Sequence, residues 1–284
     1  MTGTLQQAGK DNRWYVDWQH QRHARLFDGR FALPKDSLIR NYEFFSDVRL
    51  LNERLEALKE TRMLEVGCAT GEFSRYLGLK HPRVSYTGMD ISQPAIGRAR
   101  QKYPKTRFLV CDPGLRIPES LRSLGLDPQW PVLYTKDVLH HQTDPFGFLG
   151  QLLEACSDTL IFRTRTRDKG PTLLDPEQSC QYHYQGWMPY IVLNIDELVE
   201  QIRRRAPDSE IALYRNHTIL GGKENRFLPK DCYLPETGTA ETAVGVFLKS
   251  SSRRVHLTDR TEILGRTPWR DRLYRLIQRR GGRR

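Results

Sequence analysis

The residues best suited to chemistry in this chain are two glycines and two aspartates at regular intervals. Gly67 and Gly71 bound a five-residue turn after the apolar run "RMLEV", and glycine lets backbone N–H groups approach a ligand closely. Asp90 and Asp112 end the runs "YTGMD" and "FLVCD". Carboxylates accept hydrogen bonds, so Asp90 suits the two hydroxyls of a ribose and Asp112 the exocyclic amine of adenine. The pattern predicts a site for an adenosine.

A dinucleotide or a nucleoside triphosphate would need other residues in this turn. The NAD fingerprint starting at Gly67 requires glycine at positions 69 and 72, where this chain has Ala69 and Glu72. Glu72 would also place negative charge where a pyrophosphate would lie. The Gly-Lys-Ser/Thr of a Walker A loop is absent from the sequence. An adenosine without phosphates fits better.

An α/β sheet would bring these residues to one edge. From residue 61, short β-rich runs alternate with helix-like segments, which is typical of parallel strands with helices on both faces. Strands are expected at 62–67, 84–90, 107–112, 131–136, 159–164, 210–220 and 243–249. Ligands bind beyond the carboxyl ends of such strands, which is where the motifs fall. Residues 1–60 predict a helical cap, 61–250 the α/β domain with an insert at 168–193, and 251–284 a basic, partly helical tail.

Four stretches in this order, "LEVGCATGEF", "YTGMDIS", "FLVCDP" and "LYTKDVLHH", resemble the motifs of class I S-adenosylmethionine (SAM)-dependent methyltransferases, over about residues 60–165. The resemblance implies a doubly wound, seven-stranded, mostly parallel sheet with a reversed last strand, and SAM as the cofactor. It also implies that Glu65 and Gly67 hold the methionyl end, and that Ile91 packs on the adenine. Ala69 departs from the glycine of many members. The expected cofactor-binding residues are Glu65, Gly67, Cys68, Ala69, Gly71, Asp90, Ile91, Cys111, Asp112 and Asp137.

A second resemblance concerns the segment after the fifth strand. "GWMPYIVLNIDELVEQI" resembles a bacterial subgroup of methyltransferases associated with surface-polysaccharide gene neighbourhoods. This resemblance implies a role in polysaccharide biosynthesis and a glycan-linked acceptor.

Two adjacent histidines are the candidate catalytic residues. Methyl transfer from a sulfonium is an in-line displacement, and a hydroxyl acceptor also needs a base for its proton. "VLHH" places His140 and His141 just past the fourth strand. Adjacent side chains point in different directions, so we expect one of them, preferably His141, to face the pocket. Two interpretations stay open, a base and a histidine that packs or orients the cofactor.

Three arginines at the end of the fifth strand are candidates for binding the acceptor. Strand alternation puts Arg163, Arg165 and Arg167 on one side. Guanidinium groups bind phosphate and carboxylate, which predicts an anionic acceptor such as a sugar nucleotide, a phosphorylated sugar or an acidic glycan. The alternative is a solvated rim.

The insert at 168–193 is rich in aromatic side chains. A lid over the acceptor is one interpretation, since aromatic loops suit sugar rings, and packing in the core is the other. We expect Tyr182, His183 and Tyr184 to contact the acceptor and Trp187 to pack in the core.

The net charge of +11 lies mostly in the tail, where residues 251–284 hold eleven arginines and three acidic residues. From Thr267 the tail has the pattern of a basic amphipathic helix, which predicts an anionic membrane surface or an acidic protein as partner, or else an ordinary terminal helix. Nucleic acid is less favoured, because the tail lacks lysine and a recognised fold. No apolar run is long enough to span a bilayer and no secretory signal begins the chain, so we expect a cytoplasmic protein. If the basic tail binds an anionic membrane, the protein would be peripheral at the inner face of that membrane.

Other residue patterns bear on three further possibilities: a metal site, an RNA methyltransferase and a catalytically silent scaffold. The five cysteines form no CxxC pair and the remaining histidines have no ligand spacing, so no metal site is expected. "KDVLHH" stands where methylation of a nucleic-acid base would place Asn/Asp-Pro-Pro-Tyr/Phe, so an RNA methyltransferase is a weaker alternative. A catalytically silent SAM-binding scaffold is another. The favoured function is O-methylation of a small-molecule or glycan-linked acceptor.

Overall fold

A nine-stranded, mostly parallel sheet forms the centre of the molecule in this computed structural model, which describes residues 35–183, 186–216, 226–233 and 237–259. The strand order is β12-β9-β11-β5-β4-β1-β2-β3, and β8 pairs with β5. The strands are β1 (Thr61–Val66), β2 (Val84–Asp90), β3 (Arg107–Val110), β4 (Trp130–Lys136), β5 (Cys156–Arg167), β8 (Leu193–Asn194), β9 (Glu210–Asn216), β11 (Ala240–Phe247) and β12 (Val255–Asp259).

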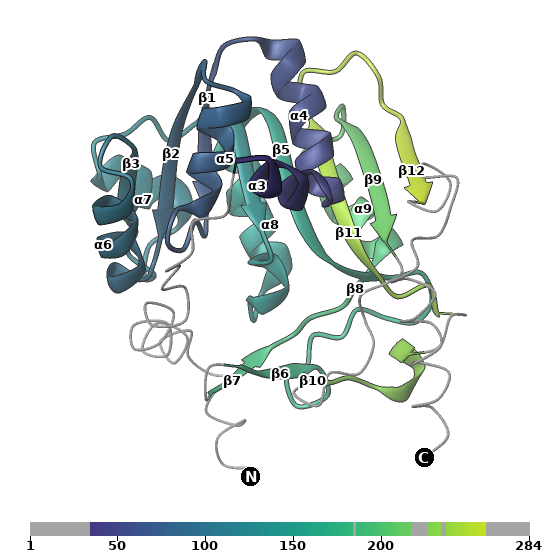
Figure 1. Ribbon diagram of the computed structural model, residues 1–284. Helices are drawn as coiled ribbons and strands as arrows, with labels where there is room; N and C mark the ends of the chain where they lie inside the picture. The colour runs from purple at the N-terminus through teal and green to yellow at the C-terminus, as the bar shows by residue number, and fades with distance from the viewer. Residues whose placement is uncertain (1–34, 184–185, 217–225, 234–236, 260–284) are drawn as a thin grey trace.

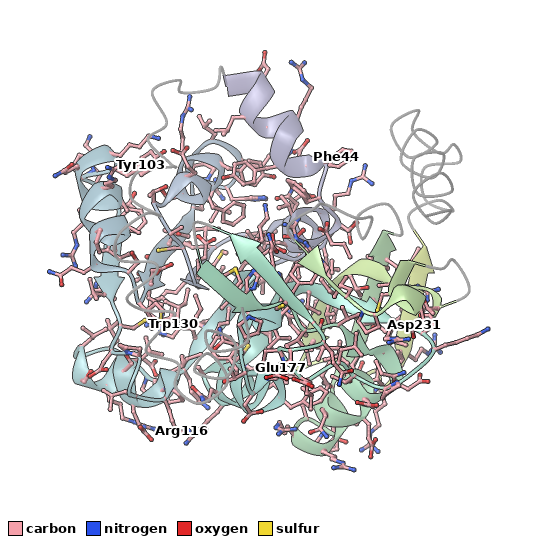
Figure 2. All side chains as sticks on the ribbon, turned by 90° about the horizontal axis from the view of Figure 1, so that it is seen from below. Phe44, Tyr103, Arg116, Trp130, Glu177 and Asp231 are labelled. Carbon is pink, nitrogen blue, oxygen red and sulfur yellow. The ribbon has the colours of Figure 1, made fainter. Side chains whose placement is uncertain are left out.

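Helices cover both faces of the sheet, as Figure 1 shows. Figure 2 views the layers from the end, with Phe44 labelled on one side of the sheet and Arg116 on the other. The helices are α3 (Lys35–Glu43), α4 (Ser46–Leu58), α5 (Glu72–Lys80), α6 (Gln93–Lys102), α7 (Ile117–Ser123), α8 (Pro145–Glu154) and α9 (Ile195–Arg205). The predicted doubly wound architecture is confirmed.

Strand alternation divides the core between the two faces. Met63, Tyr134 and Ile161 pack with α3, α4 and α5 in one cluster. Leu64 and Phe162, one residue away along their strands, pack with α7, α8 and α9 in the other. Strands buried on both faces explain the continuous apolar runs in the sequence.

Side-chain caps fix the start of two helices that pack on the sheet. Asp144 accepts a hydrogen bond from the Gly147 N–H at 2.8 Å, and Pro145 follows as the first helical residue. Asn194 accepts from the N–H groups of residues 196 and 197 and begins α9 directly after β8. These caps fix where α8 begins after the loop that follows β4, and where α9 begins directly after β8.

The reversed strand was predicted correctly, and the sheet is longer than predicted. β11 is antiparallel to both β5 and β9 and lies between them. β5 covers twelve residues where six were expected, because β11 pairs with it from Thr159 to Thr166. The short strand β8 and the edge strand β12 extend the expected seven strands to nine.

Strand β12 corrects the boundary of the tail. Residues 255–259 pair in parallel with β9, so the segment assigned to the tail from residue 251 begins inside the domain. Within it, Val255 and Leu257 alternate with polar residues, a strand pattern that the surrounding arginines obscure. The predicted basic helix from Thr267, like the first part of the helical cap, lies outside the described residues.

The insert contributes to a small antiparallel sheet beside the main one. It supplies β6 (Cys180–His183) and β7 (Gly186–Pro189), and β10 (Arg226–Phe227), which comes between β9 and β11 in the chain, completes the order β10-β6-β7. Figure 1 shows this sheet below the main one, beyond the carboxyl ends of the parallel strands. The insert therefore lies beside the edge at which the sequence motifs meet.

Candidate active site

A cleft of ≈ 600 Å³ lies at the carboxyl ends of the parallel strands. This volume is within the range of small-molecule sites. The cleft is lined by residues from all four sequence motifs and from the insert, among them Glu65, Gly67, Cys68, Ala69, Asp90, Ile91, Cys111, Asp112, Asp137, His140, His141, Arg163 and Arg165. The strand ends thus bring together residues that lie up to 100 positions apart.

The turn after β1 is held by the end of β2. The N–H groups of Gly67 and Cys68 donate to the carbonyl of Met89 at 2.8 and 3.1 Å, and the Ala69 N–H donates to Asp90 Oδ2 at 2.9 Å. Gly67, Ala69 and Gly71 all have positive φ angles, of 81°, 48° and 76°. Ala69 therefore takes a conformation that glycine would adopt without strain.

Replacing Gly67 with alanine is expected to deform this turn and to weaken cofactor binding. The new Cβ would collide with Cγ2 of Val138, and the positive φ alone costs about 1–2 kcal/mol for an L-residue. Thermal unfolding and calorimetric titration with S-adenosylhomocysteine (SAH), the demethylated form of SAM, measure both effects. Gly78→Ala is the matched control, since nothing lies within 4 Å of its Cβ. Equal melting temperatures and equal SAH affinities of the two variants would contradict the role of Gly67 in the turn and in cofactor binding.

Asp90 supports the turn while facing the cleft. Its Oδ1 accepts from the Ser92 N–H at 2.8 Å, and its Oδ2 accepts from the Ala69 N–H. Burial raises the pKa of Asp90, and these backbone hydrogen bonds oppose that rise. Each carboxylate oxygen keeps acceptor capacity for a hydroxyl in the cleft.

Glu65 is a second buried carboxyl group in the cleft. It is 5% exposed and accepts a hydrogen bond from the Tyr86 hydroxyl. Burial raises the pKa of Glu65 to about 8, against the opposing effects of Tyr86 and Lys136. A cation bound beside Glu65 would restore its ionised form.

The other predicted cofactor-binding residues also line the cleft. Asp112 is exposed, and its Oδ1 accepts from the Gly114 N–H at 2.8 Å. Cys68 and Cys111 are buried, and burial raises the pKa of both thiols. Gly71 is the exception: it precedes α5 without lining the cleft, and its role is to let the chain turn.

The predicted arginines are buried, so a solvated rim is wrong for them. Arg163 is 4% exposed and Arg165 is 5% exposed. The Nε of Arg163 donates to Asp137 Oδ1 at 3.1 Å, and the Nη1 of Arg165 lies 3.1 Å from Glu241 Oε2. Arg167 lies outside the cleft and binds Asp231. Alternation puts the three on one face, but the sequence did not predict their acidic partners.

The segment after β4 begins with Asp137, one of the acidic partners of these arginines. Asp137 has a φ of 59°, which is unusual for a residue other than glycine and is found where the surroundings impose strain. Burial raises the pKa of Asp137, but the charges of Arg163 and Arg165 hold it well below its usual range. The turn that carries the histidine pair is thereby tied to β5.

Both histidines line the cleft, whereas one was expected. Residues 139–141 form a single 3₁₀ turn, and the two rings lie 4.0 Å apart between centroids. His141 Nδ1 lies 2.8 Å from the carbonyl of Pro189. His140 is 2% exposed, and its Nδ1 has no hydrogen-bond partner among the described residues. Burial and the neighbouring His141 lower the pKa of His140 well below its usual value.

The insert contributes to the cleft through residues that the sequence did not single out. Gln181, Met188 and Tyr190 line it, and the Tyr190 hydroxyl accepts from Arg165 Nε at 2.7 Å. The predicted contacts Tyr182 and His183 belong to β6, and nothing in the structure describes their side chains. Tyr184 lies outside the described residues.

A family model for a methyltransferase domain matches residues 64–159. This segment runs from β1 to the start of β5 and includes all four motifs. This segment of the chain is a methyltransferase domain. The resemblance from the sequence is thereby confirmed, and no curated protein sequence matches the chain.

Solved structures similar to this methyltransferase include three proteins of low sequence identity. Magnesium protoporphyrin IX methyltransferase from Synechocystis PCC 6803 with bound SAM is 16% identical, with 84% of this chain and 97% of that chain covered and a TM-score of 0.48. The N-terminal domain of EvdMO1 in the presence of SAH and D-fucose is 15% identical (84% and 97% covered, TM-score 0.48). The plantazolicin methyltransferase BpumL in complex with SAH is 17% identical (86% and 99% covered, TM-score 0.46).

Several residues of the methyltransferase cleft were missed by sequence reasoning. Tyr42 comes from α3, and Lys136 stands inside the quoted motif "LYTKD". A lysine at the end of an otherwise apolar strand was the available signal for Lys136. Phe148 and Gln151 come from the face of α8 next to the cleft.

Two further observations describe the rest of the methyltransferase. A second hollow of ≈ 640 Å³, lined by residues such as Arg116, Glu154 and Arg205, contains none of the motifs.

Within the described part of the chain, none of the helices combines the length and hydropathy needed to cross a bilayer.

Proposed function

We propose that this methyltransferase transfers the methyl group of SAM to a hydroxyl of a small-molecule or glycan-linked acceptor. The observation that carries the proposal is the unpartnered Nδ1 of His140, which is 2% exposed and lines the same cleft as Asp90 and Glu65. A buried imidazole nitrogen without a hydrogen-bond partner is costly unless a ligand or water uses it. An acceptor hydroxyl is such a ligand.

The residues of the cleft fit SAM. Asp90 offers acceptor oxygens for ribose hydroxyls, and exposed Asp112 can accept from the adenine amine. Glu65 offers a carboxyl group whose ionisation an ammonium would favour. Bound here, SAM would supply an electrophilic methyl group.

His140 then serves as the base for the hydroxyl proton. The lowered pKa of His140 keeps its imidazole neutral at pH 7, so a ring nitrogen can accept a proton. The resulting imidazolium would gain from nearby Asp137, whose charge acts to raise the pKa of His140. His141, bound to the Pro189 carbonyl, orients the turn.

The anionic group proposed for the acceptor has less support. Arg163 and Arg165 face the cleft, but both are paired with carboxylates of the protein. An anionic acceptor would have to compete with Asp137 and Glu241 for them. We therefore favour an acceptor that carries no charge where it would lie beside these two arginines. Its link to polysaccharide biosynthesis stays a prediction of the sequence.

Transfer of a labelled methyl group tests this function. Purified protein is incubated with methyl-labelled SAM and fractions of a cell extract, and the product is treated with mild base. We expect label in a fraction of small molecules or glycans, with an ether link that resists base. Incorporation only into RNA would contradict the proposal, as would the absence of any transfer despite binding of SAM.

A further inference from the structure

Gln181 is a buried polar side chain that lines the cleft. It comes from β6 and is 8% exposed. Among the residues that the structure describes, none forms a hydrogen bond with its side-chain amide. An amide carries two donors and an acceptor, and a buried polar group without a partner is costly. The position of Gln181 therefore points to a ligand with polar groups of its own.

Two further residues of the insert stand beside Gln181. Gln181 and Met188 are directly opposite each other in the antiparallel pair of β6 and β7, so their side chains leave the pair on the same face. Tyr190 follows Met188 by two positions and also lines the cleft. We call Gln181, Met188 and Tyr190 the insert wall. It consists of an amide, a thioether and a phenol, and it carries no charged group.

The insert wall is fixed beside the histidine pair. The Ile191 N–H donates to the carbonyl of His140 at 2.8 Å, and His141 Nδ1 lies 2.8 Å from the carbonyl of Pro189. The rings of Tyr190 and His140 are 5.1 Å apart between centroids. The insert wall therefore borders the place where the proposed base would meet the acceptor.

The insert wall is separate from the part of the cleft expected to hold the adenosine. Asp90 ends β2 and Asp112 follows β3, whereas the histidine turn follows β4, and β1 lies between β4 and β2. Figure 1 shows β6 and β7 below the carboxyl ends of the parallel strands. The insert wall thus belongs to the part of the cleft that remains for the acceptor.

The chemistry of the insert wall suits a neutral ring with several hydroxyl groups. An amide donates to one hydroxyl and accepts from another, and it brings no charge. Met188 and Tyr190 offer apolar surface on which the C–H groups of such a ring can pack. Arg165, which donates to the Tyr190 hydroxyl, is already paired with Asp137 and Glu241. An acidic group on the ring would find no unpaired arginine there.

We propose that the insert wall binds a neutral pyranose, in which Gln181 holds hydroxyl groups other than the one that is methylated. The inference rests on the proposed function, because it names the class of acceptor for the same methyl transfer. It also replaces the aromatic contacts expected from the sequence with an amide as the residue that recognises the acceptor.

Methyl transfer to simple sugars tests the class of acceptor. Purified protein is incubated with methyl-labelled SAM and one of three sets of compounds: methyl glycosides of neutral pyranoses, those of the matching uronic acids, and simple phenols. We expect label in at least one neutral pyranoside, and slower transfer to its uronic acid counterpart.

The outcomes separate this inference from the proposed function. Phenols as the only acceptors, or a uronic acid methylated faster than its neutral counterpart, would overturn the pyranose and leave the methyl transfer standing. Label in an extract fraction but in none of the pyranosides would do the same. If neither the extract nor any compound is labelled, the proposed function fails as well.

Gln181→Leu measures the contribution of the amide. Its KM for the accepted pyranoside should be about threefold to tenfold higher than that of the wild-type protein, because a neutral hydrogen bond is lost. Its affinity for SAH and its melting temperature should stay unchanged. Gln101→Leu, which removes an exposed amide from α6, is the control. An unchanged KM in Gln181→Leu would remove Gln181 from the acceptor site.

Deoxy sugars separate a contact of Gln181 from a structural role. The hydroxyls of the accepted pyranoside that are not methylated are removed one at a time. At least one deoxy sugar should raise KM for the wild-type protein as much as Gln181→Leu does, and should cause no further rise in that variant. Equal rises in both proteins for every deoxy sugar would contradict the contact. So would the absence of any rise with the wild-type protein, whether or not the variant folds.

Discussion

Arg163→Met is expected to lower the free energy of unfolding by about 3–5 kcal/mol, as for a buried ion pair that loses one partner. Arg163 connects carboxylates from three elements: Asp47 of α4, Asp137 after β4 and Glu241 of β11. Without it, Asp137 and Glu241 keep Arg165, but among the described residues the fully buried carboxylate of Asp47 keeps no ion pair and one side-chain hydrogen bond, from the hydroxyl of Tyr134 at 2.5 Å. An uncompensated buried charge dominates the loss.

Urea unfolding of Arg163→Met measures this loss. Arg163→Lys should lose less, because it retains the charge but not the planar fork. The control is Arg204→Met, whose exposed pair with Glu200 on α9 contributes little to stability. If Arg163→Met and Arg204→Met unfold at the same urea concentration, the network does not hold the cleft together.

His140→Ala is expected to reduce turnover by about 10²–10⁴-fold, the usual contribution of a general base. Its affinity for SAH should stay close to that of the wild-type protein, because Asp90 and the glycine turn remain. Labelled methyl transfer measures turnover, and calorimetry measures binding. His256→Ala, on the exposed edge strand β12, is the control.

The pH dependence distinguishes a base from a residue that only packs. Because the pKa of His140 is lowered, the imidazole stays neutral below the ordinary value of about 6.5. The acid limb of kcat/KM should therefore lie below pH 6.5 and disappear in His140→Ala. Unchanged turnover in this variant would remove His140 from catalysis.

The parts of the site that depend on local sequence were predictable. The glycine turn, Asp90 and Asp112 lie at strand ends, as expected, because the apolar run of each strand marks where it ends. Parallel strands bring their carboxyl ends to one edge, so position along the chain was enough to gather these residues. The reversed strand followed from the resemblance to the family.

The parts that depend on distant contacts were not predictable. Nothing near Arg163 in the sequence indicates that Asp47 and Glu241, more than 75 residues away on either side, neutralise it. One cleft-facing histidine was expected because adjacent side chains usually point in different directions, whereas a 3₁₀ turn brings both rings to the cleft. Ion pairing and turn type are decided by the folded surroundings.

Isothermal titration of the purified protein with SAM and SAH tests the central claim most directly, namely that the strand ends form a site for an adenosine without phosphates. We predict saturable heat with one site per chain for both ligands, greatly weakened in Asp90→Ala. ATP and NAD should give no heat. Strong binding of ATP or NAD, with no heat from SAM or SAH, would contradict the account.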